Sequence, residues 1–569
     1  ASIAWSLYAM FIMADQLAAG QVHEAMMTGM DNLYFESAGT ILSLVTVGKY
    51  LETRSKSKTG GAIEALIDLA PKTATVVAED GSETTVDVDS ILPGQILRVR
   101  PGESIPVEKT AGDTVNAATV NRTGSFTFRA TRVGAETSLA KIIKLVEDAN
   151  ATKAPIARMA DKVAGVFVPV VFVISAVTFL AWMTLTGSVN EALTSAVAVL
   201  VISCPCALGL ATPVAIMVGT GKGAEMGILF KSAEALENLR SVGTVVLDKT
   251  GTVTRGKPAV TDIVVATRAD GSRTMSEKAL LKLAAALERS SEHPLAEAIM
   301  AECEARGIVA RMVEDFAAVP GRGVTAREGQ NVIAAGNVRL MDELGVTVPA
   351  GLAEQLAAEG KTPLFFAKNS ELVGTIAVAD EVKETSAEAI AALRSLGVDV
   401  RMLTGDNRVT AEAIARRVGL NSKQVIADVL PADKERHVRE LQDAGGKVAM
   451  VGDGINDSPA LARADVGLAI GTGADIAKEG ADVVLMRSDL MDVARAIELS
   501  RATIRNIKQD LFWALFYNGI GIPLAAGVFF PLTGWQLSPM FGAAAMSLSS
   551  VCVVSNALRL RTFKPKVAK

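Results

Sequence analysis

The sequence predicts a multidomain membrane protein, in which an α-helical transmembrane bundle is joined to a β-rich domain and to a doubly wound α/β domain. Half of the 569 residues are hydrophobic and 21% are charged, so apolar blocks must alternate with ordinary soluble domains. Several of these blocks approach the ~20 apolar residues that are needed to cross ~30 Å of hydrocarbon. Between them, the chain shows the periodicities of strands and helices.

Six apolar runs are candidate membrane spans. Two of them, Ala1–Met13 and Ser37–Leu51, are short or interrupted, and a buried amphipathic helix is the alternative there. The connectors 17–35, 187–191 and 531–537 contain no Lys or Arg, whereas basic residues flank the opposite ends of the runs. This asymmetry predicts three hairpins, with the segments 55–157 and 221–500 in the cytoplasm. The four longer runs are Val163–Thr186, Ala192–Val218, Leu511–Phe530 and Ser538–Leu558.

Composition argues against two other classes of protein. The net charge of −5 provides no basic surface for nucleic acid. The four cysteines form no disulfide framework, so we expect reduced thiols. The chain starts at Ala1 inside an apolar run, and we therefore expect that an amino-terminal part is lacking.

The two soluble segments differ in their patterns. Residues 73–100 alternate apolar and polar residues around Asp80-Gly81 and Pro93-Gly94, which indicates antiparallel strands. The larger segment alternates apolar strands with helices, as a parallel doubly wound sheet does. Ligands bind at the carboxyl ends of such strands, and here those ends carry Asp248, 404–406 and 452–454.

The stretch "LDKTGT", residues 247–252, places a carboxylate directly after a buried strand. Gly251 lets backbone amides approach a phosphate, and the neighbouring Lys249 adds positive charge. A carboxylate attacks phosphorus when cations neutralise the crowded negative charge, so Asp248 is a candidate for an acyl phosphate. Taken alone, an Asp at a strand end is as often a helix N-cap.

Three motifs together resemble the phosphorylation domain of P-type ATPases: Asp-Lys-Thr-Gly-Thr at 248–252, Thr-Gly-Asp at 404–406 and "GDGINDSPAL" at 452–461. The resemblance implies a haloacid-dehalogenase-like fold, with ATP as substrate and Mg²⁺ as cofactor. It also implies that Asp248 forms the aspartyl phosphate, and that Thr250, through its carbonyl, and Asp453 bind Mg²⁺. The catalytic site is then completed by Lys249, Thr404, Gly405, Asp406, Lys434, Asn456 and Asp457.

An insertion at about 256–377 is similar to the α+β nucleotide-binding domain of the heavy-metal branch of this family. His293 alone reads as an ordinary loop histidine. The resemblance instead implies that it orients the adenine nucleotide. The matching set consists of Glu288, His293, Gly321, Gly323 and Asn337.

The stretch "VISCPCALGLATP", residues 201–213, puts two cysteines around a proline at the end of an apolar run. Residues two apart point away from each other on a regular helix, so Cys204 and Cys206 need a break to hold one ion. Pro205 supplies that break, at a depth where irregular backbone is tolerated only around an enclosed site. Thiolates select soft metals, although a single buried cysteine is usually only a small hydrophobic residue.

The last two spans contribute Tyr517, Asn518, Met546 and Ser550, and neither contains Asp, Glu, His or Lys. A thioether beside two thiolates suits Cu(I) or Ag(I), whereas Zn²⁺ favours nitrogen or carboxylate ligands. The set resembles the Cu(I)-exporting subgroup. That resemblance implies carboxylates at the cytoplasmic entry (Glu52, Asp161) and at the exit (Glu36), a copper chaperone as partner, and a bacterial inner-membrane location.

One motif departs from the family. The actuator domain is expected to carry Thr-Gly-Glu, but the chain reads "VRPGESIPVEK", with Pro101 before Gly102 and Glu103. About twenty residues are missing there, so Glu103 is a weakly matched catalytic residue and slow phosphoenzyme turnover is expected. The expected domains are 1–54 (two transmembrane helices), 55–157 (shortened actuator), 158–220 (helices with Cys-Pro-Cys), 221–255 with 378–500 (phosphorylation), 256–377 (nucleotide binding) and 501–569 (last two helices and tail).

Two alternatives to a Cu(I) exporter stay open. One is a Zn²⁺, Cd²⁺ or Pb²⁺ pump with the same phosphorylation chemistry. The other is a metal-binding membrane protein that does not transport, because of the missing segments. A soluble phosphatase with the same sheet is excluded by the predicted spans.

Overall fold

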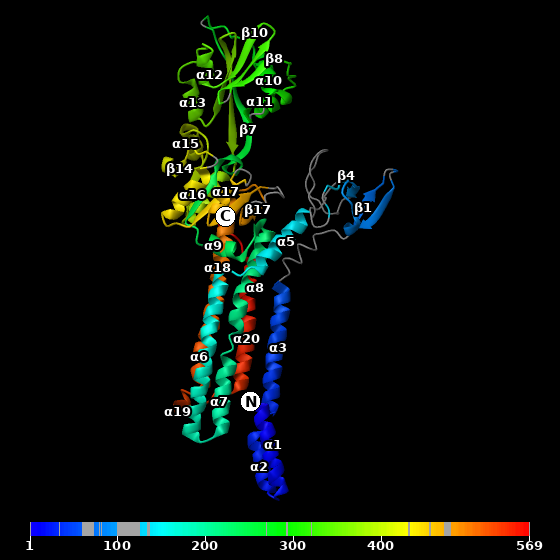
Figure 1. The fold of residues 1–569 in the computed structure, drawn as a ribbon, viewed down its shortest axis with the longest axis vertical. Helices are drawn as coiled ribbons and strands as arrows, with labels where there is room; N and C mark the ends of the chain where they lie inside the picture. The colour runs from blue at the N-terminus through cyan, green and yellow to red at the C-terminus, as the bar shows by residue number, and fades with distance from the viewer. Residues whose placement is uncertain are drawn as a thin grey trace. The chain divides into compact units, whose positions relative to one another are not determined.

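The computed structural model describes residues 2–33, 35–59, 73–78, 80, 82–99, 126–131, 133, 137–268, 270–291, 294–319, 321–430, 433–453, 457–471 and 480–567. The chain divides into two compact units. Residues 1–240 and 497–565 form the first, and residues 241–496 and 566–569 form the second. Both units are drawn in Figure 1.

The first unit contains the long apolar helices. Within the described part of the chain, three helical segments are long and apolar enough to cross a membrane: Ile143–Thr186, Val189–Glu225 and Pro539–Thr562. This confirms a membrane protein, whereas the predicted spans at α1, α3 and α18 stay predictions. The helices are α1 (Ser2–Ala18), α2 (Val22–Asn32), α3 (Phe35–Thr59), α5 (Ser138–Ala151), α6 (Pro155–Thr186), α7 (Val189–Ile202), α8 (Cys206–Glu225), α9 (Ala233–Leu239), α18 (Met491–Ala525), α19 (Phe530–Thr533) and α20 (Pro539–Leu558).

Helices α6, α7, α8 and α20 run side by side (Figure 1), and α20 contacts both α7 and α8. Val171 of α6, Val199 and Ile202 of α7 and Ile522 of α18 form one apolar cluster. A glycine permits a close approach of α18 to α7, since a Cβ on Gly521 would lie 2.5 Å from Cδ1 of Ile202. The cluster therefore packs α18 against the end of α7, directly before the Cys-Pro-Cys stretch.

A small antiparallel sheet follows the first helices. Its strands are β1 (Thr73–Val77), β2 (Glu83–Asp87), β3 (Ile96–Val99) and β4 (Phe126–Arg129), in the order β2-β1-β3-β4. The register pairs Val77 with Glu83 across the turn, where Oδ1 of Asp80 accepts a hydrogen bond from the Ser82 amide. These four strands confirm that the chain contains the predicted β-rich domain.

The second unit is built on a parallel sheet. Its strands lie in the order β14, β13, β6, β15, β16 and β17, and neighbouring strands run parallel. Val246, Leu403 and Met450 are fully buried in its core, as the apolar runs predict. The strands are β6 (Thr244–Asp248), β13 (Asp399–Leu403), β14 (Val425–Ile426), β15 (Val448–Gly452), β16 (Val466–Ile470) and β17 (Val483–Leu485), and the helices are α14 (Ser386–Ser395), α15 (Arg408–Arg417), α16 (Lys434–Asp443) and α17 (Ser458–Arg463).

Two long strands, β7 (Thr254–Val265) and β12 (Glu371–Val382), lead into a second sheet of the same unit (Figure 1). This sheet is antiparallel and has the order β7-β12-β11-β10-β9-β8. Helices α10 and α11 cover it through an apolar core that includes Leu280, Ile299 and Phe366. Its other elements are α10 (Glu277–Glu288), α11 (Pro294–Ala305), β8 (Glu314–Val319), β9 (Gly323–Glu328), β10 (Asn331–Gly336), α12 (Val338–Glu343), α13 (Leu352–Ala358) and β11 (Thr362–Lys368).

The contact between Gly521 and Ile202 gives a testable prediction about stability. Gly521→Ala forces a methyl group onto Ile202 Cδ1, and such overpacking lowers the free energy of unfolding by about 1–3 kcal/mol. Melting temperatures of the detergent-solubilised variants measure the effect. Adding Ile202→Val removes Cδ1 and should restore much of the loss. Gly519→Ala is the matched control, because nothing lies within 4 Å of its Cβ position; equal melting of the two Ala variants would contradict the packing.

Candidate functional site

The candidate active site lies at the carboxyl ends of three adjacent strands. Strand β6 ends at Asp248 between β13 and β15, and Asp248 is in register with Leu403 of β13. Because parallel strands end at the same sheet edge, the loops after β6, β13 and β15 meet there. The structure thus brings together the Asp-Lys-Thr-Gly-Thr, Thr-Gly-Asp and Gly-Asp motifs.

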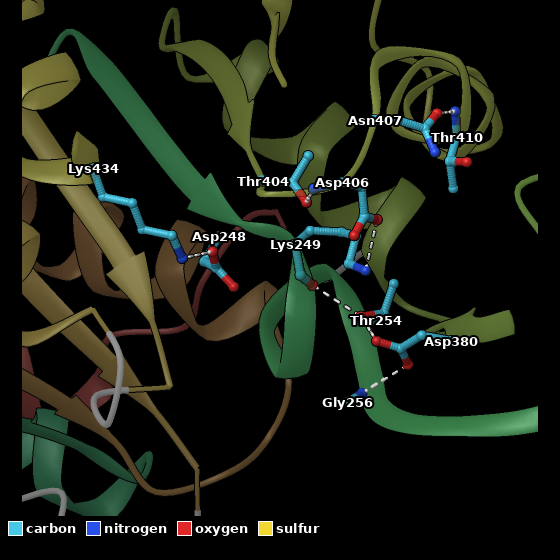
Figure 2. Close-up of polar contacts among 10 residues, drawn as sticks. All are labelled: Asp248, Lys249, Thr254, Gly256, Asp380, Thr404, Asp406, Asn407, Thr410 and Lys434. Carbon is cyan, nitrogen blue, oxygen red and sulfur yellow. Dashed lines mark hydrogen bonds and ion pairs between the residues drawn. The ribbon is translucent and has the colours of Figure 1, made fainter. Parts of the chain in front are cut away.

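Asp248 is 5% exposed and accepts a hydrogen bond from Lys434 Nζ at 2.6 Å (Figure 2). The same ammonium group also contacts Oδ1 of Asp457 at 2.6 Å. Neither Asp248 nor Asp457 caps a helix with its side chain, so the N-cap alternative for these residues is wrong. The two carboxylates therefore share one buried cation.

Burial shifts the titration of this group. Desolvation, the charge of Asp457 and, less strongly, that of Asp453 raise the pKa of Asp248 to about 6, against the opposing effect of Lys434. Burial alone would lower the pKa of Lys434, but Asp248 and Asp457 raise it overall. Lys434 therefore keeps its proton and its positive charge at neutral pH, while Asp248 titrates close to the physiological range.

The loop after β6 approaches the loop after β15 without a side chain between them. Gly251 has a φ of +73°, and a Cβ built on it would lie 3.4 Å from Oδ2 of Asp453. Within the loop after β15, Gly452 has less room, because its Cβ would lie 2.4 Å from Oδ2 of Asp457. Thr250 has extended backbone in this loop. Asn456 lies outside the described residues.

The loop after β13 holds the second cation of the site. Lys249 Nζ pairs with Oδ2 of Asp406 at 2.8 Å, and the amide of Asp406 donates to the Thr404 hydroxyl at 3.1 Å (Figure 2). Thr404 is 2% exposed, and its hydroxyl keeps its own hydrogen to donate. A Cβ on Gly405 would lie 3.1 Å from the Val429 carbonyl, so a side chain there would crowd the loop.

Sequence reasoning missed two residues that hold the Asp248 loop. Lys383 Nζ donates to the Gly251 carbonyl at 2.6 Å and to the Ser488 hydroxyl at 2.9 Å. Asp380 accepts hydrogen bonds from the Thr254 hydroxyl and from the Gly256 amide (Figure 2). Burial lowers the pKa of Lys383. No local motif marks these residues, because the contacts join segments more than 120 positions apart.

The predicted nucleotide-binding residues are only partly described. Asn337 Nδ2 donates to the Gly321 carbonyl at 3.0 Å, and its Oδ1 caps α12 by accepting from Leu340. A Cβ on Gly323 would lie 2.1 Å from the Ala335 carbonyl, so the β9–β10 pairing requires this glycine. Glu288 is 5% exposed, and its burial raises its pKa. His293 lies outside the described residues.

The Cys-Pro-Cys stretch interrupts the helix, as predicted. Helix α7 ends at Ile202 and α8 begins at Cys206, with Pro205 in a non-helical conformation between them. Cys204 is disulfide-bonded, so the expectation of reduced thiols is wrong for this cysteine in the structure. The side chain of Cys206 lies outside the described residues. Binding of a metal ion by Cys204 therefore requires its reduction.

The later helices present buried polar and thioether groups. Asn518 of α18 is 1% exposed, and its Oδ1 has no hydrogen-bond partner among the described residues. Met546 and Ser550, one turn apart on α20, are 9% and 4% exposed. Tyr517 is half-buried and forms side-chain hydrogen bonds with Ser549 and Asn518. No group of three or more His, Cys, Asp or Glu residues that could hold a metal occurs in the described ranges.

The predicted entry and exit residues are less informative. Asp161 pairs with Lys153 at 2.9 Å, and both side chains are largely exposed. Glu36 is exposed in the first turn of α3. The side chain of Glu52 lies outside the described residues, as does Glu103 with the whole stretch 100–125.

Comparisons with known proteins agree with this geometry. The haloacid dehalogenase-like hydrolase family matches residues 242–465. The P-type ATPase actuator domain matches residues 68–108 and 101–147. The two actuator matches overlap at 101–108, which is the stretch with the irregular Gly-Glu motif.

Curated relatives match along nearly the whole chain. It is 49% identical over 560 residues to a probable copper-transporting ATPase of Synechococcus elongatus, covering 94% of this chain and 74% of that protein. It is 46% identical to a silver exporting P-type ATPase of Salmonella typhimurium, covering 95% and 68%. A crystal structure of a zinc-transporting PIB-type ATPase in the E2·Pi state has a TM-score of 0.62 and 32% identity, covering 98% and 94%. The chain belongs to the heavy-metal branch of the P-type ATPases.

Proposed function

We propose that this protein uses ATP to export Cu(I), or the chemically similar Ag(I), across a membrane through a phosphoaspartate at Asp248. The observation that carries the proposal is the convergence of Lys434, Asp457 and Asp453 on a buried Asp248. The copper and silver specificities of the relatives support the choice of cargo. The bacterial inner membrane, with the soluble units in the cytoplasm, is the proposed location.

The carboxylates fit a magnesium ion. Asp453 and Asp248 lie on adjacent loops, and Gly251 leaves the space between these loops free of a side chain. Hard oxygen ligands of this kind suit Mg²⁺, so Asp248, Asp453 and the Thr250 carbonyl are the proposed ligands. When bound, Mg²⁺ offsets the negative charge that gathers during phosphoryl transfer.

The residues of this chain then have separate roles. The Asp248 carboxylate attacks the γ-phosphoryl group of ATP, which breaks the bond to the β-phosphate oxygen and releases ADP. Lys434 and the Thr404 hydroxyl stabilise charge on the transferring group. Lys249 is held by Asp406, and Lys383 fixes the Gly251 carbonyl, so both position the loop. Asn456 and the nucleotide set Glu288, His293, Gly321, Gly323 and Asn337 are further proposed contacts to substrate.

The transport site is proposed at the break between α7 and α8. Cys204 and Cys206 would supply thiolates, and Met546 a thioether, which together favour a soft monovalent cation. Tyr517, Asn518 and Ser550 are the proposed polar neighbours. We further propose that the ion enters past Glu52 and Asp161 and leaves past Glu36. Glu103 is proposed to act in hydrolysis of the phosphoenzyme, and a copper chaperone is proposed to deliver the ion.

Metal-stimulated ATP hydrolysis by the purified, reduced protein is the experiment that tests this function. Cu(I) and Ag(I) should stimulate hydrolysis, whereas stimulation by Zn²⁺ alone would favour the zinc pump to which the solved neighbour points. Vesicle uptake separates a pump from a metal-binding protein, because Cys206→Ala and Asp248→Asn should each abolish ATP-driven uptake. Metal binding without uptake by the unaltered protein would refute export.

The close approach of Gly452 to Asp457 predicts an active-site effect of a single methyl group. Gly452→Ala must displace Asp457 from Lys434, and a misplacement of this size lowers the rate of Asp248 phosphorylation by about 100-fold. Incorporation of radiolabelled phosphate from ATP measures the rate. Gly243→Ala is the control, since nothing lies within 4 Å of its Cβ position. Equal rates in the two variants would show that the contact is not needed.

The raised pKa of Asp248 predicts that protons compete with Mg²⁺. A carboxyl group with a pKa of about 6 is mostly ionised at neutral pH and gains a proton as the pH falls through 6, so Mg²⁺ affinity must fall in that window. Between about pH 7.5 and about pH 5.5 the expected loss is about fourfold. Calorimetric Mg²⁺ titrations of the nucleotide-free protein measure it. Asp248→Asn should abolish this loss of Mg²⁺ affinity. An unchanged pH dependence in that variant would show that another group takes up the proton.

A further inference from the structure

Helix α18 carries a buried polar pair, Asn506 and Asp510, on the amino-terminal side of Tyr517. Asn506 and Asp510 are 6% and 3% exposed, and their spacing of four residues places them on the same helix face. Both contact Asn556 of α20. Asn506 Nδ2 donates to the Asn556 carbonyl at 2.9 Å, and Asn556 Nδ2 donates to Oδ1 of Asp510 at 2.9 Å.

A third contact fixes the orientation of the Asn556 amide. Arg559 Nη1 donates to Asn556 Oδ1 at 2.9 Å, so the NH₂ group of Asn556 must point toward Asp510. The amide of Asn506 is oriented in the same way, because its NH₂ group already donates to the Asn556 carbonyl. The atoms of Asn506 and Asp510 that remain without a partner among the described residues are therefore both oxygens.

Those remaining oxygens are both acceptors. Oδ2 of Asp510 and Oδ1 of Asn506 are buried and have no hydrogen-bond partner among the described residues. A buried acceptor without a donor costs about 1–3 kcal/mol. Two such atoms on one helix face cannot satisfy each other, since neither carries a hydrogen when Asp510 is ionised.

The ionised form of Asp510 also leaves its charge without an ion-pair partner in the described structure. The guanidinium group of Arg559, on the turn after α20, donates to Asn556 and attracts the Asp510 carboxylate without forming an ion pair with it. Arg505 and Lys508 on α18 are exposed. On α8, Lys222 pairs with Glu225. A buried carboxylate without a paired cation costs several kcal/mol.

A proton on Asp510 removes the charge penalty and supplies a hydrogen-bond donor. The proton neutralises the Asp510 carboxylate and turns its Oδ2 into an O–H donor. This donor lies on the same face of α18 as Asn506. A bridging water molecule would satisfy the two acceptors but would leave the charge. A hard metal cation requires more oxygen ligands than the two offered.

We propose that Asp510 and Asn506 form a proton-binding site on the same helix as Tyr517 and Asn518. Asp510 takes up this proton under mildly acidic conditions, and loss of the proton leaves a buried charge that weakens the contact between α18 and α20. The site is defined without copper or ATP, so it does not depend on the proposed transport function.

Infrared difference spectroscopy of the copper-free, nucleotide-free protein tests this site. A protonated carboxyl C=O band should appear as the pH is lowered from neutral into the mildly acidic range, and it should disappear as the pH is raised. Asp510→Asn should remove the band, whereas Asp161→Asn, which changes an exposed and ion-paired carboxylate, should leave it. Asn506→Leu deletes the acceptor and should make the band disappear at a lower pH.

Thermal melting provides a second measurement. Asp510→Asn removes the buried charge and supplies an N–H donor, so this variant should melt at or above the temperature of the unaltered protein at neutral pH. A mildly acidic spectrum in which Asp510→Asn leaves the protonated carboxyl band unchanged would overturn the proposal. So would stabilisation of the unaltered protein, but not of Asp510→Asn, by K⁺ or Mg²⁺, because that result identifies a metal cation as the occupant.

Discussion

The active site depends on one buried ammonium group, that of Lys434, held between Asp248 and Asp457. Without it, two carboxylates would face each other in a site where both are at most 5% exposed. Removing one partner from a buried ionic group of this kind costs about 3–5 kcal/mol. The same contact keeps a basic nitrogen beside the nucleophile, where negative charge gathers during phosphoryl transfer. Stability of the sheet edge and reactivity of Asp248 therefore have a common origin.

The parallel sheet explains why this arrangement forms. Each strand ends where its apolar run stops, and the three polar loops that follow are brought to one edge by hydrogen bonding of β13, β6 and β15. Gly251 leaves room for Asp453 on the neighbouring loop, and Gly452 leaves room for Asp457 within the loop after β15. Lys383 and Asp380 then tie the Asp248 loop to the strand that leads back from the inserted domain. The local sequence thus determines which reactive side chains each loop carries, and strand pairing determines how close the loops lie to one another.

The sequence predicted the parts of the structure that depend on local pattern. Apolar periodicity and motif spacing predicted the strand ends, the parallel and antiparallel sheets and the helix break at Pro205. The resemblance to P-type ATPases implied that Asp248, Thr404 and Lys434 share one site. Lys383, Asp380 and the Asn506–Asp510 pair were not predicted, because their roles arise from contacts between distant segments or across helices. The disulfide at Cys204 was also not expected, since composition alone favoured reduced thiols.

The most direct test of the central contact is phosphoenzyme formation from radiolabelled ATP in Lys434→Met, compared with Arg439→Met. Arg439 lies on the same helix but is exposed and pairs with Glu435. If Lys434 neutralises the site, its loss should lower phosphorylation of Asp248 on the order of 100-fold, as does removal of one charge-stabilising donor in other enzymes, while Arg439→Met stays unchanged. Phosphorylation of Lys434→Met at the rate of the unaltered protein would contradict the account.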